Sequence, residues 1–257
     1  MSSMDKTQFS ILEVKTQILE NEAWAAALLR ERLRKEGILF VNLMASPGAG
    51  KTTTLVRTIE ALGSRYRIGV IEADADGQVD ARTIAATGTR VLQVHTGGSC
   101  HMDLSMTEKA LEELGTDNLD LVFLENVGNL VCPAEFDVGA SLRVMILSTP
   151  EGHDKPLKYP LMFQVSDVIL VNKMDVAEVF DFNLETFREN VRTRNKDAEI
   201  IPFSAANGQG FERWIGWLTE RLSERQTERM SERQTERLRD RLTEEKIQAQ
   251  EAENESH

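Results

Sequence analysis

The residues best suited to chemistry form a glycine-rich segment, Ser46-Pro47-Gly48-Ala49-Gly50-Lys51-Thr52-Thr53, which follows the apolar run 38–44 and precedes a helical pattern. This order of strand, glycine-rich loop and helix is typical of the P-loop that binds nucleotide phosphates. Gly48, Ala49 and Gly50 are expected to direct backbone N–H groups at the phosphates, because glycine permits a tight turn and the helix dipole adds positive potential there. The segment therefore predicts a nucleotide-binding site.

Side chains near this loop are candidates for hydrolysis. Lys51 is expected to reach the β- and γ-phosphates, and the hydroxyl of Thr52 is expected to bind Mg²⁺. Thr53, the next residue, is expected to belong to the same nucleotide-binding loop. Asp74 and Glu125 each close an apolar run, and both are candidates for holding Mg²⁺ or positioning water, although such carboxylates also cap loops. Because no further residue stands out as a catalytic base, we expect slow intrinsic hydrolysis.

A second loop, Asn172-Lys173-Met174-Asp175, follows the apolar run 167–171. The Asp175 carboxylate can accept hydrogen bonds from both the ring N–H and the exocyclic amine of guanine. Adenine lacks that pair of donors, so the loop indicates GTP and GDP as the nucleotides. Lys173 is expected to lay its alkyl stem along the nucleotide, and Ser204-Ala205 suits a backbone contact to the guanine carbonyl.

The two cysteines of the chain suggest a third site. Cys100 and His101 are adjacent, and Gly97-Gly98 before them predicts a turn that brings both side chains to one side; Cys132 lies shortly after Glu125. Thiolate and imidazole ligands suit Zn²⁺ or Ni²⁺. Three ligands are too few for a tetrahedral site, so an ion shared across a dimer two-fold axis would complete it. The alternative is that the thiols are simply buried and that the histidine packs or caps.

The elements that position these loops alternate between short apolar strands and amphipathic helices. Apolar residues at helical spacing predict an N-terminal helix over 8–36, ending near Gly37. Several strands are apolar at nearly every position, as parallel strands covered on both faces are. The pattern predicts an α/β fold with a three-layer, doubly wound, mostly parallel sheet of the P-loop NTPase type. The expected strands are 38–44, 67–72, 90–94, 119–125, 142–148, 167–172 and 198–202.

The composition changes near residue 219, where a unit rich in Glu and Arg, 223–230, is nearly repeated in 231–238. The apolar positions of this repeat are too widely spaced for a coiled-coil seam. We therefore expect three parts: an N-terminal helical segment over 1–36, a GTPase domain over 37–218, and a charged tail, helical or disordered, over 219–257.

Charge and composition exclude several classes of partner. The 257 residues include 30 Lys and Arg against 42 Asp and Glu, a net charge of −12, which argues against binding to nucleic acid or to anionic membranes. No apolar run is long enough to span a membrane, and no signal peptide is evident. With two cysteines, which fit a reducing compartment, we expect a cytoplasmic protein.

Six strings, in order between residues 8 and 218, resemble the HypB family, the nickel-incorporation GTPases of nickel–iron hydrogenase maturation. They are Ser46-Pro47-Gly48-Ala49-Gly50-Lys51-Thr52, Ala86-Thr87-Gly88-Thr89, Cys100-His101-Met102-Asp103, Glu125-Asn126-Val127-Gly128-Asn129-Leu130-Val131-Cys132-Pro133, Glu151-Gly152-His153-Asp154-Lys155-Pro156-Leu157-Lys158-Tyr159-Pro160 and Asn172-Lys173-Met174-Asp175.

The resemblance implies a GTP-dependent homodimer in which Cys100, His101 and Cys132 bind nickel or zinc at the interface. It also implies delivery of nickel to a hydrogenase large subunit, with a small nickel- and zinc-binding partner, HypA. Some members carry a cysteine-rich N-terminal metal motif or a histidine-rich tract; this chain, with four histidines, has neither, so we do not expect nickel capture or storage by its N-terminus. Lys155 is a candidate for holding nucleotide or a partner subunit, or for anchoring its loop.

Two other functions stay open. The related urease-type nickel GTPases share the fold, but that family has a Cys-Pro-His metal motif, whereas here Cys100-His101 and Cys132-Pro133 are separate. A non-enzymatic metal-binding scaffold with a vestigial nucleotide site conflicts with the intact Lys51 and Asp175.

Overall fold

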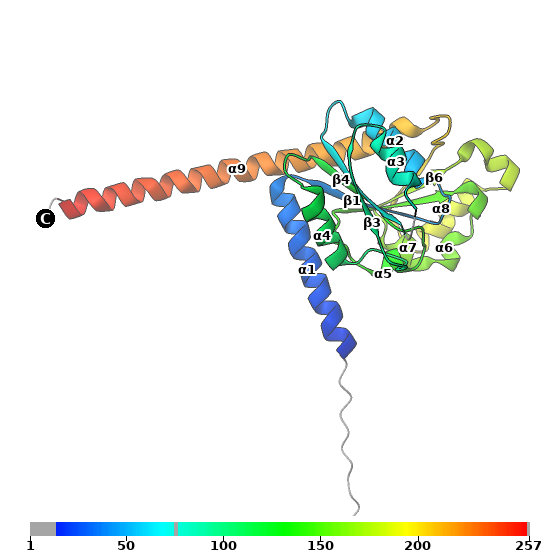
Figure 1. Ribbon diagram of the computed structural model, residues 1–257, viewed down its shortest axis with the longest axis horizontal. Coiled ribbons are helices and arrows are strands. Elements are labelled where there is room, and N and C mark those ends of the chain that lie inside the picture. The colour runs from blue at the N-terminus through cyan, green and yellow to red at the C-terminus, as the bar shows by residue number, and fades with distance from the viewer. Residues whose placement is uncertain (1–13, 75–76, 256–257) are drawn as a thin grey trace, which may run out of the picture.

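A parallel sheet of seven strands lies at the centre of the part of the chain that the computed structural model describes, residues 14–74 and 77–255 (Figure 1). The strands are β1 (Leu39–Ala45), β2 (Ile68–Asp74), β3 (Arg90–His95), β4 (Leu121–Glu125), β5 (Leu142–Ser148), β6 (Val168–Asn172) and β7 (Glu199–Pro202). Their order across the sheet is β3-β2-β4-β1-β5-β6-β7. All the expected strands are present, and the predicted α/β architecture is confirmed.

Helices cover both faces of this sheet. They are α1 (Val14–Glu36), α2 (Lys51–Leu62), α3 (Val79–Ala85), α4 (Leu104–Leu114), α5 (Cys132–Glu135), α6 (Lys155–Lys158), α7 (Pro160–Val165), α8 (Leu184–Arg192) and α9 (Phe211–Glu255), with 3₁₀ turns η1 (Thr149–Glu151) and η2 (Met174–Phe180). One face of the sheet packs against α2, α3 and α9, and the other against α1, α4, α7 and α8. Strand order reverses beside β1, and such switch points are where doubly wound sheets bind ligands.

The helix α1 ends as the sequence predicts. Gly37 has a φ of 79°, in the left-handed region that favours glycine. Its N–H donates to the carbonyl of Arg34, and the N–H of Ile38 donates to the carbonyl of Leu33, at 3.0 and 2.9 Å. These two bonds form a Schellman motif, which closes the helix and turns the chain into β1. The first residues of the expected helix, 8–13, lie outside the described residues.

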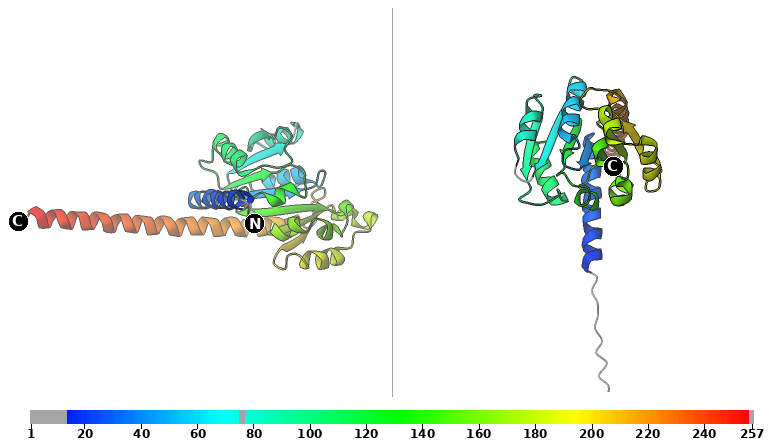
Figure 2. Two further views of the ribbon diagram at one scale, coloured as in Figure 1. Left: turned by 90° about the horizontal axis from the view of Figure 1, so that it is seen from below. Right: turned by 90° about the vertical axis from the view of Figure 1, so that its right-hand side faces the viewer.

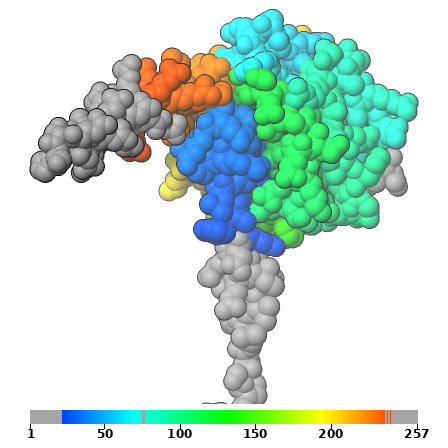
Figure 3. All heavy atoms as spheres, turned by 60° about the vertical axis from the view of Figure 1, so that its left-hand side comes forward, coloured from blue at the N-terminus to red at the C-terminus, as the bar shows by residue number. Residues whose placement is uncertain are grey.

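The charged repeat continues a helix that begins in the core. In α9, Trp214 and Leu222 are buried, and the indole N–H of Trp214 donates to the hydroxyl of Thr58 on α2 at 2.9 Å. The expected boundary at residue 219 therefore falls inside an unbroken helix, which extends away from the sheet (Figure 2). The start of the charged part of α9 lies against the end of α1 (Figure 3). There Arg34 forms an ion pair with Glu232.

Within the described residues, no helix combines the length and the apolar character that a bilayer crossing requires.

Candidate functional site

The P-loop links the buried strand β1 to α2. Gly48 and Gly50 have φ values of 74° and 98°, so both occupy the conformation that glycine tolerates best. Gly50 is the N-cap of α2 and has no side chain to bond to the first turn. The N–H groups of that turn are left for an anion, in the positive field of the helix dipole. Lys51, Thr52 and Thr53 follow directly as the first residues of α2.

The predicted guanine-reading loop is hydrogen-bonded to the P-loop through Asn172, at the end of β6. The buried amide of Asn172 donates to the carbonyl of Ala49 at 2.9 Å and accepts from the backbone N–H of Ala205, also at 2.9 Å. A Cβ on Gly50 would collide with this amide. One side chain therefore holds together three segments that the sequence assigned to the nucleotide.

The neighbouring residues complete this edge of the site. Lys173 donates from Nζ to the carbonyl of Gly48 at 2.8 Å, and its own carbonyl accepts from the hydroxyl of Thr149 at the same distance. Asp175 is exposed on the first turn of η2, while Ser204 is buried. The exposed carboxylate of Asp175 is accessible to a nucleotide base, and hydrogen bonds from the neighbouring residues hold the loop that carries it.

A cavity of about 260 Å³ lies between the P-loop and the ends of β2 and β4. Lys51 and four carboxylates line it, those of Glu72, Asp74, Asp80 and Glu125. Two of them are fixed: Glu125 accepts from the hydroxyl of Thr52 at 2.8 Å, and Asp74 accepts from the N–H of Gly77 at 3.0 Å. The structure thus brings Lys51, Thr52, Asp74 and Glu125 to one place, as Mg²⁺ binding would require.

Glu72 and Asp80 belong to the same cavity, although the sequence did not single them out. Glu72 and Glu125 are register partners on the adjacent strands β2 and β4, and both are buried. Within the described residues, no donor reaches the second carboxylate oxygen of either glutamate. The signal in the sequence was the spacing of Glu72 and Asp74, because residues two apart on a strand lie on one face.

Burial and the neighbouring carboxylates raise the pKa values of both glutamates. Desolvation, followed by the charges of Glu125 and Asp74, raises the pKa of Glu72 to about 8. Desolvation also raises the pKa of Glu125 to about 7, against the opposing effects of Lys51 and of the hydrogen bond from Thr52. Without a cation, the cavity therefore favours protonated carboxyl groups near neutral pH.

The segment that follows β4 lies against the P-loop. A Cβ on Gly128 would come within 3.0–3.2 Å of three atoms of Pro47, so the two loops approach each other closely at this point. The N–H of Asn129 donates to the carbonyl of Ala45 at 2.9 Å. The same segment then leads, three residues later, to Cys132 at the start of α5.

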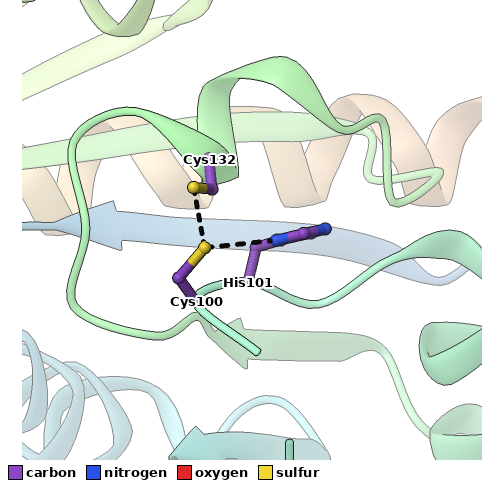
Figure 4. A group of neighbouring side chains, drawn as sticks. All are labelled: Cys100, His101 and Cys132. Atoms are coloured by element: carbon purple, nitrogen blue, oxygen red, sulfur yellow. Dashed lines mark hydrogen bonds between the residues drawn. The ribbon is translucent and has the colours of Figure 1, made fainter. Parts of the chain in front are cut away.

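Cys132 meets the other two predicted metal ligands (Figure 4). The ligand atoms of Cys100, His101 and Cys132 all lie within 4.8 Å of one another. The two sulfur atoms are 2.7 Å apart, and Sγ of Cys100 lies 3.7 Å from Nδ1 of His101. The expected turn before Cys100 is present, with both Gly97 and Gly98 at positive φ. Two segments distant in sequence thus form a soft-ligand cluster that could hold Zn²⁺ or Ni²⁺.

Neighbouring side chains orient the cluster. The ring of His101 stacks on Phe136, with centroids 3.8 Å apart and an interplanar angle of 17°. The side-chain amide of Asn129 donates to Sγ of Cys132 at 3.4 Å. The adjacent sulfur of Cys100 and desolvation raise the pKa of the Cys132 thiol, so a cation is needed to favour the thiolate.

Known proteins are similar to this chain in sequence and in fold. Residues 39–202 match the family model described as CobW/HypB/UreG, nucleotide-binding domain. A hydrogenase maturation factor HypB from Azotobacter vinelandii is 43% identical over 219 residues, which cover 85% of this chain and 72% of that protein. This chain belongs to the HypB family.

Two further HypB proteins extend the comparison. The hydrogenase/urease maturation factor HypB of Helicobacter hepaticus is 42% identical over 204 residues, covering 74% of this chain and 84% of its own. The crystal structure of HypB from Helicobacter pylori in complex with nickel has a TM-score of 0.74 and 36% identity, and the match covers 79% of this chain and 96% of that one. The nucleotide-binding GTPase fold expected from the P-loop therefore agrees with the family.

Proposed function

We propose that this protein is a GTP-hydrolysing metallochaperone that binds nickel or zinc at Cys100, His101 and Cys132 and promotes nickel insertion into a nickel–iron hydrogenase. The observation that carries the proposal is the meeting of these three ligands within 4.8 Å, on segments adjoining the nucleotide pocket. The nickel complex of a HypB relative supports nickel as the cargo.

Nucleotide hydrolysis is assigned to the cavity beside the P-loop. Lys51 would bind the β- and γ-phosphates, and Thr52, Asp74 and Glu125 would hold Mg²⁺ or position water. Mg²⁺ fits this cavity, because it prefers oxygen ligands and because one buried carboxylate oxygen of Glu72 and one of Glu125 accept no hydrogen bond from the described residues. When bound, the ion would neutralise charge on the phosphates. Guanine would be read by Asp175, with Asn172, Lys173, Ser204 and Ala205 shaping the loop around it.

Coupling between the two sites follows from their shared segment. Glu125 adjoins the proposed Mg²⁺ site, Gly128 touches the P-loop, and Cys132 is a metal ligand. A γ-phosphate that displaces Gly128 would therefore shift Cys132. Such coupling is reciprocal, so the metal must change nucleotide affinity by the same factor.

The partners are part of the proposal. Three protein ligands leave a tetrahedral ion one donor short, and a second copy of the chain in a GTP-dependent homodimer would supply it. We propose a HypA-like nickel-binding protein and the hydrogenase large subunit as the other partners, in the cytoplasm, where thiols remain reduced.

The test compares the nickel affinity of the protein with GDP and with a non-hydrolysable GTP analogue, in the wild type and in Cys132→Ala. We expect a nucleotide-dependent affinity in the wild type and weak, nucleotide-independent binding in the variant. GTP turnover should be lost in Lys51→Ala, whereas a wild-type protein without turnover would favour a non-enzymatic scaffold. Maturation of urease is the second candidate, because the Helicobacter hepaticus relative is described as serving both enzymes; supplying each apoenzyme separately distinguishes the two.

A further inference from the structure

Asn126 occupies the point where the nucleotide pocket, the metal-ligand loop and β1 come together. It directly follows Glu125, and its side chain has no exposed surface. In the sequence, Asn126 belongs to a segment that resembles the HypB family, and no role was predicted for it. A fully buried amide needs hydrogen-bond partners, because an unsatisfied polar group costs free energy on burial.

Its partners come from three different segments. The side-chain oxygen accepts from the backbone N–H of Met102 at 3.2 Å and from the N–H of Val127 at 2.9 Å. The side-chain nitrogen donates to the oxygen of Asn42 at 3.1 Å, and Asn42 is itself buried on β1. Because two N–H groups converge on one atom, that atom must be the oxygen, which fixes the orientation of the amide.

The bond to Met102 joins parts of the chain that are far apart in sequence. Asn126 and Met102 are 24 residues apart, and Met102 directly follows His101. The side chain of Met102 is also fully buried, so Met102 is packed against its neighbours as well as hydrogen-bonded to Asn126. Cys132 is connected to the nucleotide pocket along the chain, but Cys100 and His101 belong to the loop before α4.

We propose that Asn126 is a positioning residue that transmits the state of the nucleotide pocket to Cys100 and His101, through the hydrogen bond that it accepts from the backbone of Met102. This inference rests on the proposed function, since it needs a metal affinity that depends on the nucleotide. When the end of β4 shifts, Asn126 moves Met102 through this hydrogen bond. The segment 127–132, which follows Asn126 in the chain, moves with the end of β4. Both halves of the ligand cluster then change together.

The test measures the ratio of nickel dissociation constants with GDP and with a non-hydrolysable GTP analogue. In Asn126→Ala we expect this ratio to fall toward one by roughly two- to tenfold, the effect of one ordinary hydrogen bond. The thiolate-to-nickel charge-transfer band should persist with both nucleotides, because the three ligands are unchanged. The matched control is Asn195→Ala, which removes another multiply bonded asparagine, one that donates to the carbonyls of Phe163 and Ser166 at the far end of β6.

Hydrogen exchange of the segment 99–103 gives a second measurement that does not need the metal. In the wild type and in Asn195→Ala, we expect the exchange rate of this segment to differ between the two nucleotides. In Asn126→Ala, we expect the exchange to be faster and to have the same rate with both nucleotides. A wild-type ratio that survives in Asn126→Ala, or that falls equally in Asn195→Ala, overturns the role of Asn126 and leaves the proposed function standing. A wild-type ratio of one overturns the proposed coupling, and this inference with it.

Discussion

The paired glutamates beside the P-loop should make the stability of the metal-free, nucleotide-free protein fall as pH rises. The pKa of Glu72 is raised from 4.5 to about 8, so the folded state keeps a proton that the unfolded state has released. The free energy of unfolding therefore decreases as pH rises from about 4.5, the pKa of this group in the unfolded chain, to about 8, and is level above that. Replacing Glu72 with Gln removes this titration while keeping the shape of the side chain.

The raised pKa sets the size of the effect. At about 1.4 kcal/mol per pKa unit, a rise from 4.5 to about 8 corresponds to roughly 5 kcal/mol at full deprotonation. Glu72 lines a cavity and does not lie in the packed core, and buried sites in proteins behave as if the dielectric constant were about 20, so we expect a smaller effect of about 2–3 kcal/mol. At pH 8, Glu72→Gln should then be more stable than the wild type by this amount, which is roughly 5–10 °C in melting temperature for a chain of this size. At pH 5 the two proteins should differ little.

The assay is thermal and urea unfolding of wild type and Glu72→Gln from pH 5 to 8.5 in the presence of a chelator. Glu60→Gln, at an exposed position on α2, controls for the loss of a negative charge. Mg²⁺ with GDP should flatten the wild-type slope, because a cation compensates the carboxylates. A wild-type stability that is constant or rises between pH 5 and 8, with Glu72→Gln parallel to it, would refute the reasoning.

The remaining predictions concern the P-loop and α9. Gly50→Ala should abolish nucleotide binding, measured by calorimetry, because the new Cβ would collide with a buried amide. As a control, Gly88→Ala should bind nucleotide normally, because Gly88 also has a positive φ but lies in open space. Trp214→Phe should lower stability by about 1–3 kcal/mol, measured by urea unfolding, because the hydroxyl of Thr58 loses its donor; an unchanged midpoint would contradict this. Deleting 236–257 should shift the melting temperature by less than about 2 °C, since the helix is anchored well before that segment.

The sequence was sufficient to predict those features that depend on a local pattern of residues. The P-loop, the strand edges and the end of the first helix at Gly37 each depend on residues within one short segment. Apolar runs bounded by turn residues located the strands, most clearly β1, β4 and β6, which are buried at every position because helices cover both faces of the sheet. The pairing of Cys100-His101 with Cys132 was also predictable, since both segments follow strands that end at the same edge of the sheet.

What could not be predicted depends on which strands are neighbours. Glu72 faces Glu125 because β4 lies between β2 and β1, an order that no local pattern encodes. Asn126 acquires its role from Met102 and Asn42, whose positions are fixed by tertiary packing. The charged repeat after residue 219 contains few apolar residues, so the sequence alone did not reveal that its helix starts in the core.

The length of α9 has a consequence for how the molecule moves through solution. Its 45 residues form a helix of about 68 Å, at 1.5 Å per residue, and most of it projects from the sheet. A rod of this length on a rounded body increases friction much more than it increases mass. Gel filtration should therefore overestimate the molecular mass of a monomer, enough to suggest a dimer. Light scattering or sedimentation equilibrium, which report mass directly, are the methods to use when testing the proposed nucleotide-dependent association of this chain.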